Sequence, residues 1–186
     1  MSNRIITIGR EFGSGGREFG KRLAEELGIA YYDREIMEEI SKRTQLAESY
    51  IHHIVEGAPG IYYPITIGKT MHGAEPDYLL RQYTSVYAEQ TNTIRDMAEK
   101  SDCVIVGRCA DFILKDRPDT LHIFIHSDME HRAERIVRLY GETKQTPQKR
   151  LQEKDSKRKV YYKHYTNCNW GEAENYDLCL DSGTLG

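Results

Sequence analysis

The residues with the clearest chemical potential form a glycine-rich stretch at positions 9–18, which reads GREFGSGGRE. Four of these ten residues are glycine, and arginines stand at positions 10 and 17. Where such a loop runs into a helix, several backbone N–H groups converge at the positive end of the helix dipole and bind phosphate. A tight turn without a ligand is the alternative, but it would require fewer glycines. The stretch therefore indicates a site for a phosphorylated ligand.

The charged residues of this loop differ from those of the ordinary phosphate-binding loop. That loop reads G-x-x-x-x-G-K-[ST], with a lysine for the β and γ phosphates and a hydroxyl for magnesium. Here Arg10 stands at the position of the first glycine, Gly16 at that of the lysine and Glu18 near that of the hydroxyl. The positive charge and the metal ligand are therefore expected from other residues.

Two arginines and one carboxylate are the candidates for these roles. A guanidinium group binds two phosphate oxygens at once, so we expect Arg17 or Arg10 to supply the charge of the missing lysine and to act in catalysis. A carboxylate is a common magnesium ligand, so we expect Glu18 to take part in binding Mg²⁺ directly or through water.

A second candidate site follows the apolar run at residues 103–106. Gly107 and Arg108 come directly after this run, at the point where parallel α/β sheets place their ligands. We expect Arg108 to bind an anionic substrate; the alternative is a structural arginine that pairs with Asp111. Asp33 follows another apolar run, where it can bind substrate, cap the next helix, or do both.

Positive charge also gathers near the carboxyl end of the chain. Residues 149–159 contain six basic side chains and two acidic ones. Most charge runs are solvated helix faces. In a chain that also has a phosphate-binding loop, we favour a mobile cationic lid, which would exclude water and concentrate positive charge on a transferring phosphoryl group.

Hydrophobic periodicity predicts the elements that position these groups. Short apolar runs predict strands at residues 5–8, 29–32, 103–106, 121–125 and 176–180. Helices are predicted from the glycine loop to Gly28, from Asp33, at residues 77–98, from a capping box of Ser127 and Glu130, and from Thr146 with Pro147. Alternating strands and helices predict an α/β fold with a parallel sheet that has helices on both faces.

Length and composition indicate one domain and exclude several classes of protein. The 186 residues suffice for a substantial core, and 39% hydrophobic with 30% charged residues argues against disorder. A formal net charge of -3 gives no general attraction to nucleic acid. Residues 44–77, which are interrupted by Pro, Gly, His and Tyr, indicate an insertion that is also a candidate surface for homo-oligomer formation, and residues 142–170 indicate the lid.

The sequence also makes a prediction about location. No run approaches the length of a membrane span, and the amino terminus lacks the apolar region of a signal peptide. We therefore expect a cytoplasmic protein that does not contact membranes.

Three motifs, in this order, resemble the cytidylate kinase-like proteins of the nucleoside monophosphate kinase group. ITIGREFGSGGREFGKRLAEELG and the following YYDREI resemble the phosphate loop, first helix and second strand of that group. VIVGRCAD at residues 104–111 is similar to its second signature, and YDLCLDS to its last strand. The resemblance runs from residue 5 to 186 and implies a single P-loop kinase-like domain with a P-loop NTPase-type sheet.

The resemblance also implies an activity and a set of site residues. The activity is transfer of the γ-phosphoryl group of ATP, with Mg²⁺, to a small acceptor, most plausibly CMP or dCMP. The alternatives are a kinase for another small metabolite and a nucleotide-binding regulatory protein without turnover. The donor nucleotide would be bound by Gly13, Ser14, Gly15, Gly16, Arg17 and Glu18. The acceptor would be bound by Asp33, Arg108, Asp111, Lys154 and Asp155, with Asp155 facing the cytosine, and lid arginines Arg150 and Arg158 would join Arg10 and Arg17 in catalysis.

The chain departs from the cytidylate kinases at three positions. Those proteins have lysine where Gly16 stands and aspartate where Val106 precedes Gly107. Leu151 replaces an expected lid arginine, for which neighbouring Arg150 is a candidate substitute. The positive charge around the transferring phosphoryl group is therefore expected to be arranged differently in this chain.

Overall fold

The computed structural model describes residues 3–56 and 76–185. In this part of the chain one five-stranded sheet has the order β2-β3-β1-β4-β5, and every pairing in it is parallel. The strands are β1 (Ile5–Arg10), β2 (Ala30–Tyr32), β3 (Cys103–Val106), β4 (Thr120–His126) and β5 (Leu178–Asp181). The predicted parallel sheet is confirmed.

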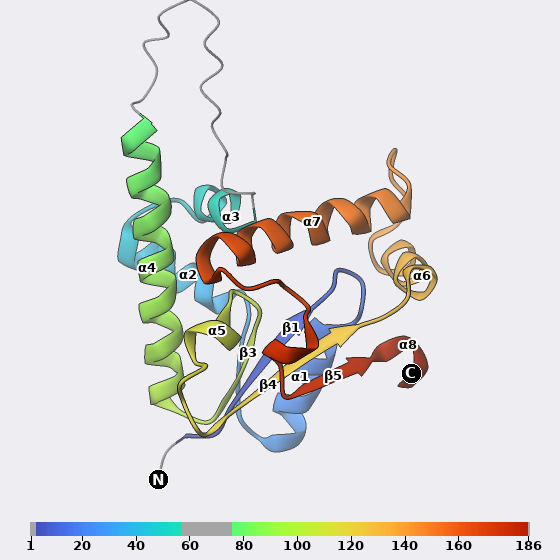
Figure 1. The fold of residues 1–186 in the computed structure, drawn as a ribbon, viewed down its shortest axis with the longest axis horizontal. Helices are drawn as coiled ribbons and strands as arrows, with labels where there is room; N and C mark the ends of the chain where they lie inside the picture. Colours follow the sequence, from blue (N-terminus) through green and yellow to red (C-terminus); the bar gives the residue numbers. More distant parts are fainter. Residues whose placement is uncertain (1–2, 57–75, 186) are drawn as a thin grey trace, which may run out of the picture.

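The helices cover both faces of this sheet, as the sequence predicts (Figure 1). In β3, Val104 and Val106 belong to a core cluster with Ala24 of α1, whereas Cys103 and Ile105 belong to a second cluster on the other face. Successive residues of a strand point to opposite faces, so a fully apolar strand serves both clusters. The helices are α1 (Gly16–Leu27), α2 (Glu35–Thr44), α3 (Glu48–Glu56), α4 (Pro76–Lys100), α5 (Ala110–Ile113), α6 (Met129–Tyr140), α7 (Pro147–Thr166) and α8 (Ser182–Leu185), with a 3-10 turn, η1 (Ala173–Asn175).

The helix ends agree with the sequence pattern at some positions and correct it at others. Gly28 ends α1 with a φ of 63°, and the Thr146 side chain caps α7 by accepting a hydrogen bond from Lys149 N. The cap of α6 is Asp128, not Ser127, because the Asp128 carboxylate accepts hydrogen bonds from two backbone N–H groups. The start of α2 also differs, because its cap position is Arg34 and Asp33 precedes it.

The predicted insertion at residues 44–77 contains a helix that is part of the core. Residues 48–56 form α3, which buries Ile51, Ile54 and Val55 in the cluster between the sheet and α4. Residues 57–75, on which the predicted oligomer surface largely falls, lie outside the described residues.

Helix α7 crosses the molecule from the side of α4 to the side of α6 (Figure 1). It buries Leu151 and Asp155 in its first half and Tyr161, Tyr162 and Thr166 in its second half. This helix, which contains the basic run of the predicted lid, is thus anchored by side chains along its length. Among the helices of residues 3–56 and 76–185, none is long and apolar enough to span a membrane.

Candidate functional site

The glycine loop connects the end of β1 to the start of α1 and is held by a hydrogen bond to β4. Gly13 and Gly15 have φ values of 83° and 82°, which glycine adopts without strain. The buried Ser14 hydroxyl lies 3.0 Å from the carbonyl oxygen of Ile125 in β4, to which it donates a hydrogen bond. No side chain of the described residues caps α1 at Gly15. The first N–H groups of α1 are therefore left for an anion.

Gly16 and Arg10 are coupled by close packing. A Cβ atom added to Gly16 would lie 2.5 Å from the Cβ atom of Arg10, a distance that real side chains do not reach. The position of the ordinary loop lysine therefore cannot carry a side chain while Arg10 keeps its place. The Arg10 guanidinium reaches the end of β3, where a Cβ atom added to Gly107 would overlap its Nη1 atom.

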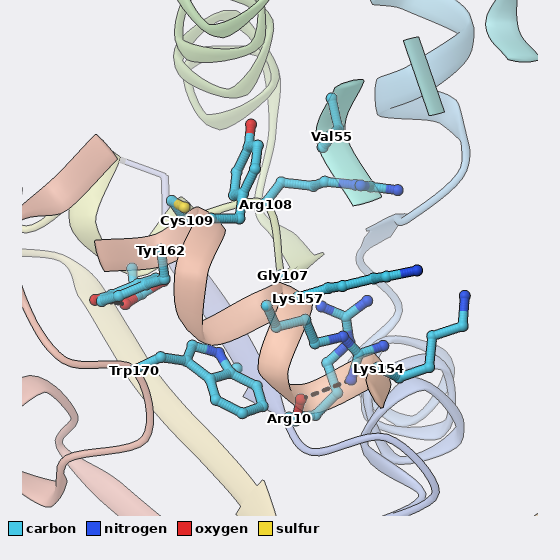
Figure 2. Close-up of a pocket in the computed structure, with 13 residues that line it drawn as sticks. Arg10, Val55, Gly107, Arg108, Cys109, Lys154, Lys157, Tyr162 and Trp170 are labelled. Atoms are coloured by element: carbon cyan, nitrogen blue, oxygen red, sulfur yellow. Dashed lines mark hydrogen bonds between the residues drawn. The ribbon is translucent and has the colours of Figure 1, made fainter. Parts of the chain in front are cut away.

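A pocket of about 60 Å³ lies where these groups meet the end of β3 and helix α7. Five of its lining side chains are basic, and Asp111 is the carboxyl group among the described lining residues. Figure 2 shows the nitrogen-bearing ends of Arg108 and Lys154 on one side of the pocket and Cys109 with Tyr162 on the other. The basic residues are Arg10, Arg108, Lys154, Lys157 and Arg158.

The positive charges of this pocket act on one another. Burial, and then repulsion from Arg158, lower the pKa of Arg10 from 12.5 to about 9. Arg108 and Arg17 add to this repulsion, and Asp33 opposes it. Arg10 thus remains charged at neutral pH but in an unfavourable field, which a bound anion would relieve.

Arg108 enters the pocket from an unusual backbone turn. Gly107, Arg108 and Cys109 have consecutive positive φ values of 73°, 58° and 55°. Residues other than glycine adopt this conformation at a cost, and such strain concentrates at functional sites. The turn is held by Gln90 of α4, whose amide donates to the Arg108 carbonyl at 3.0 Å and accepts from the Tyr161 hydroxyl at 3.1 Å.

Asp111 is buried beside this turn and is engaged by α7. The Tyr162 hydroxyl donates to Asp111 Oδ2 at 2.5 Å. Burial raises the pKa of Asp111, so its charged form is disfavoured. In this structure Asp111 joins α5 to α7.

Arg17 and Asp33 form an ion pair next to the pocket. Arg17 Nε lies 2.6 Å from Asp33 Oδ2, and the Asp33 side chain is buried. Arg17 is half-exposed and directed to this carboxylate, whereas Arg10 lines the pocket. Of the two arginines that the sequence offers as substitutes for the lysine, the geometry favours Arg10.

Glu18 is held by arginines on its exposed side of α1. It pairs with Arg22 at 2.5 Å and with Arg135 of α6, and its hydrogen bond to Arg135 lowers its pKa. The Arg135 guanidinium lies over Gly15, 3.3 Å from the position of an added Cβ atom. Among the described residues no three His, Cys, Asp or Glu side chains gather to hold a metal ion. Glu18, the carboxylate that the sequence offers for Mg²⁺, is thus paired with Arg22 and Arg135 in this structure, and its part in metal binding stays a prediction.

The remaining predicted residues lie on α7 at different depths. Lys154 and Arg158 line the pocket, and Arg158 also donates to the Arg10 carbonyl at 3.1 Å. Asp155 is absent from the pocket lining and binds the backbone N–H of Phe12. Arg150 donates to the carbonyl of Gly141 near the end of α6, outside the pocket.

Two arginines of α6, Arg132 and Arg135, and Gln90 of α4 were not predicted from the sequence. Arg132 pairs with Asp155, and Arg135 with Glu18, so both reach the loop across the fold. Their three-residue spacing on the helix after β4 was the available signal. Gln90 gave none, because its role depends on the turn at Arg108.

Comparisons with known proteins agree with this architecture. The model of the cytidylate kinase-like family matches residues 5–184. A cytidylate kinase from Methanopyrus kandleri is 26% identical over 187 aligned positions, which cover 96% of this chain and 84% of that protein. A solved structure of an uncharacterized protein from Eubacterium ventriosum has a TM-score of 0.70 at 30% identity, covering 98% of this chain and 93% of the other.

Shikimate kinases have the same fold at lower similarity. The enzyme from Bacteroides thetaiotaomicron has a TM-score of 0.55 at 14% identity, and the similarity covers 96% of this chain and 86% of that one. The shikimate kinase from Acinetobacter baumannii, solved with shikimate, has a TM-score of 0.51 at 14% identity, with 97% of this chain and 84% of that one covered. These likenesses show that the chain shares its α/β fold with the shikimate kinases.

Proposed function

Since the chain belongs to the cytidylate kinase-like family, we propose that it transfers the γ-phosphoryl group of ATP to a nucleoside monophosphate, with CMP or dCMP as the acceptor. The relative from Methanopyrus kandleri carries the name cytidylate kinase, which supports this choice of acceptor. The observation that carries the proposal is the group of basic side chains between the glycine loop and the end of β3.

The charge balance of the pocket suits a transferring phosphoryl group. Five basic side chains line it, and the one carboxyl group among its described lining residues, Asp111, has a raised pKa. Phosphoryl transfer requires little covalent help from the protein, because alignment and neutralisation of the oxygen charges lower most of the barrier. A reaction between two anionic substrates needs such a concentration of positive charge.

On the donor side, both backbone N–H groups and arginine side chains would bind the phosphates of ATP. The uncapped N–H groups that follow Gly15 would bind the phosphates of ATP at the start of α1. Arg10 would supply the charge that the lysine gives in the ordinary loop, because its guanidinium lines the pocket and its Cβ atom excludes a side chain at Gly16. Arg135, which lies over Gly15, would add charge at the outer face of the loop.

On the acceptor side, Arg108 would bind the phosphate of the monophosphate. Its strained turn, fixed by Gln90, presents the guanidinium at the carboxyl end of β3. Lys154 and Arg158 would face the same phosphate from the α7 side of the pocket. The Arg17 and Asp33 pair borders this site.

Magnesium commonly accompanies ATP in kinases, where it neutralises charge on the β and γ phosphates. In this chain the carboxylate expected to bind it, Glu18, pairs with Arg22 and Arg135. We therefore assign positive charge at the transferring group to guanidinium and ammonium groups of the pocket and give Glu18 the role of orienting Arg135.

The proposal is tested by incubating the protein with ATP and each common nucleoside monophosphate and measuring ADP release together with the diphosphate product. We expect CDP or dCDP to form with the largest kcat/KM. ATP binding without product from any acceptor would contradict the proposal and favour a regulatory protein.

The position of Asp155 favours a second candidate function. The carboxylate that the resemblance places against cytosine binds the glycine loop and does not line the pocket. A kinase for another small anionic acceptor therefore agrees with the same charges. Product from a non-nucleotide phosphate or from a carboxylate that bears a hydroxyl group, in the absence of product from CMP, would support it.

A further inference from the structure

We propose that Asp155 is a positioning residue that fixes the glycine loop and does not recognise the base of the acceptor. The proposal rests on the proposed function and deepens it. The Asp155 carboxylate, on α7, accepts a hydrogen bond from the backbone N–H of Phe12 at 2.8 Å. Its other oxygen lies 2.6 Å from Nη1 of Arg132 on α6.

The ion pair of Asp155 and Arg132 is buried, and each of its side chains makes further polar contacts. Asp155 and Arg132 are 7% and 6% exposed. Arg132 also donates to the carbonyl of Phe12 at 3.3 Å, and its Nε lies 3.5 Å from the Glu11 carboxylate. Both backbone groups of Phe12 are therefore held by this ion pair. Removing one partner would leave the other buried charge with only a longer pairing, that of Arg132 with Glu11 at 3.5 Å or of Asp155 with Arg158 at 3.8 Å, which is unfavourable.

The contact controls the part of the loop that would bind phosphate. Phe12 precedes Gly13, where the backbone enters the left-handed region with a φ of 83°. Glu11, on the other side of Phe12, accepts a hydrogen bond from the backbone N–H of Ser127 at 3.2 Å. Fixing residues 11–13 orients the N–H groups that follow, and groups that are oriented before the ligand arrives bind it more tightly.

The neighbouring Arg158 supports this interpretation. It stands three residues after Asp155 and donates to the Arg10 carbonyl at 3.1 Å, while it lines the pocket. One turn of α7 thus holds the backbone of the loop at residues 10 and 12. The three-residue spacing of Asp155 and Arg158 therefore serves contacts with the loop, and Asp155 does not line the pocket.

The test compares Asp155→Asn with the wild type in two independent measurements. Calorimetry gives the Kd for ATP, and initial rates give the ratio of kcat/KM for CMP to that for UMP. We expect ATP affinity to fall about tenfold or more, as the loss of a charge-assisted contact implies, while the CMP to UMP ratio stays within about twofold of the wild type. Glu134→Gln, which removes an exposed carboxylate from α6, is the matched control and should change neither.

A double variant distinguishes loss of the positioning contact from a general loss of folding. Arg132→Gln with Asp155→Asn removes both buried charges together, and the asparagine oxygen can still accept from Phe12 N–H. We expect this variant to bind ATP more tightly than Asp155→Asn, because no buried guanidinium is left facing a neutral side chain at position 155. Equal or weaker binding by the double variant would overturn the proposal, as would a collapsed CMP to UMP ratio with unchanged ATP affinity in Asp155→Asn.

Hydrogen exchange of the Phe12 amide separates this proposal from the proposed function. Faster exchange in Asp155→Asn than in the wild type is expected, and unchanged exchange would overturn the positioning role. A wild-type protein that binds no nucleotide would contradict the proposed function, and the positioning role would then be judged by this exchange rate alone.

Discussion

Arg10 is the residue on which the account of the site depends. It leaves β1 at the position of a loop glycine, reaches the end of β3 and enters the pocket. Its pKa is lowered to about 9 by burial and by neighbouring cations, foremost Arg158. Because the folded-state pKa lies below that of a free guanidinium, the charge on Arg10 reduces the stability of the folded chain at neutral pH. The reduction disappears only as pH rises from about 9 toward 12.5.

Replacing Arg10 by Met should therefore raise the melting temperature of the ligand-free protein, by about 2–4 °C for each kcal/mol of repulsion relieved. The same change should reduce the stabilisation given by ATP, by about 1.4 kcal/mol for each tenfold loss of affinity. Thermal unfolding with and without ATP measures both effects. Arg138→Met, on the exposed end of α6, is the control. A lower melting temperature with undiminished ATP stabilisation would refute this role for Arg10.

At the level of elements, α7 is joined to both turns that form the site. Its middle contacts the glycine loop through Asp155 and Arg158. Further along, Tyr161 binds Gln90, which holds the turn at Arg108, and Tyr162 binds Asp111 beside that turn. The helix therefore sets the distance between the donor side and the acceptor side. The lid stays a prediction, and in this structure its helical part, α7, is joined to the rest of the fold by these side chains.

The hydrogen bond from Tyr162 to Asp111 is the shortest of these contacts, and a conservative change can remove it. Tyr162→Phe leaves a buried carboxyl without its 2.5 Å donor, and we expect the free energy of unfolding to fall by about 1–3 kcal/mol. Tyr165→Phe removes a weaker contact of 3.4 Å on the same helix and should cost less. Urea unfolding measures the difference; equal losses in the two variants would show that Asp111 does not depend on Tyr162.

Local sequence signals predicted most of the strands and helices but not the contacts between them. The β-branched run before the glycines predicted β1, and Pro147 after Thr146 predicted the start of α7. The capping pattern at Ser127 was misleading because Asp128, one residue later, offers a better acceptor. Residues 48–56 were predicted within an insertion, because the Pro and Gly that follow obscured the three buried side chains of α3.

The candidate site shows the same division. The glycine loop and Arg108 were predicted, since each follows a strand directly in the sequence. Arg132 and Arg135 were missed, because they meet the loop only after α6 packs across it. Asp155 was predicted as a substrate ligand, and its placement at the loop depends on the rotation of α7, which a charged helix does not reveal in its sequence.

At the scale of the whole molecule, the imidazole of His122 makes the free energy of unfolding depend on pH. His122 of β4 lies with Nδ1 2.7 Å from the Thr7 hydroxyl oxygen, and burial lowers its pKa below 6.5. The folded chain therefore resists protonation that the unfolded chain accepts. The contribution of His122 to stability is complete above pH 6.5 and is lost as pH falls from 6.5 through the lowered folded-state pKa.

We expect the unfolding free energy of the wild type to fall between about pH 7 and pH 5.5 more steeply than that of His122→Gln. The difference should approach about 1.4 kcal/mol for each unit by which the pKa is lowered. Asp111, whose pKa burial raises, acts in the opposite direction at lower pH and interacts electrostatically with His122, so the comparison reports the two groups together. Urea unfolding at the two pH values provides the test, and parallel slopes would contradict it.

The central claim is that Arg10 supplies the positive charge that a loop lysine supplies elsewhere, and exchanging the two side chains tests it most directly. The activity, measured as kcat/KM for ATP, should fall in Arg10→Gly. Gly16→Lys alone should be less stable than the wild type, because the new Cβ atom would lie 2.5 Å from that of Arg10. The double variant, Arg10→Gly with Gly16→Lys, should recover at least about tenfold over Arg10→Gly. A double variant no more active than Arg10→Gly, or a fully stable and active Gly16→Lys protein, would contradict the claim.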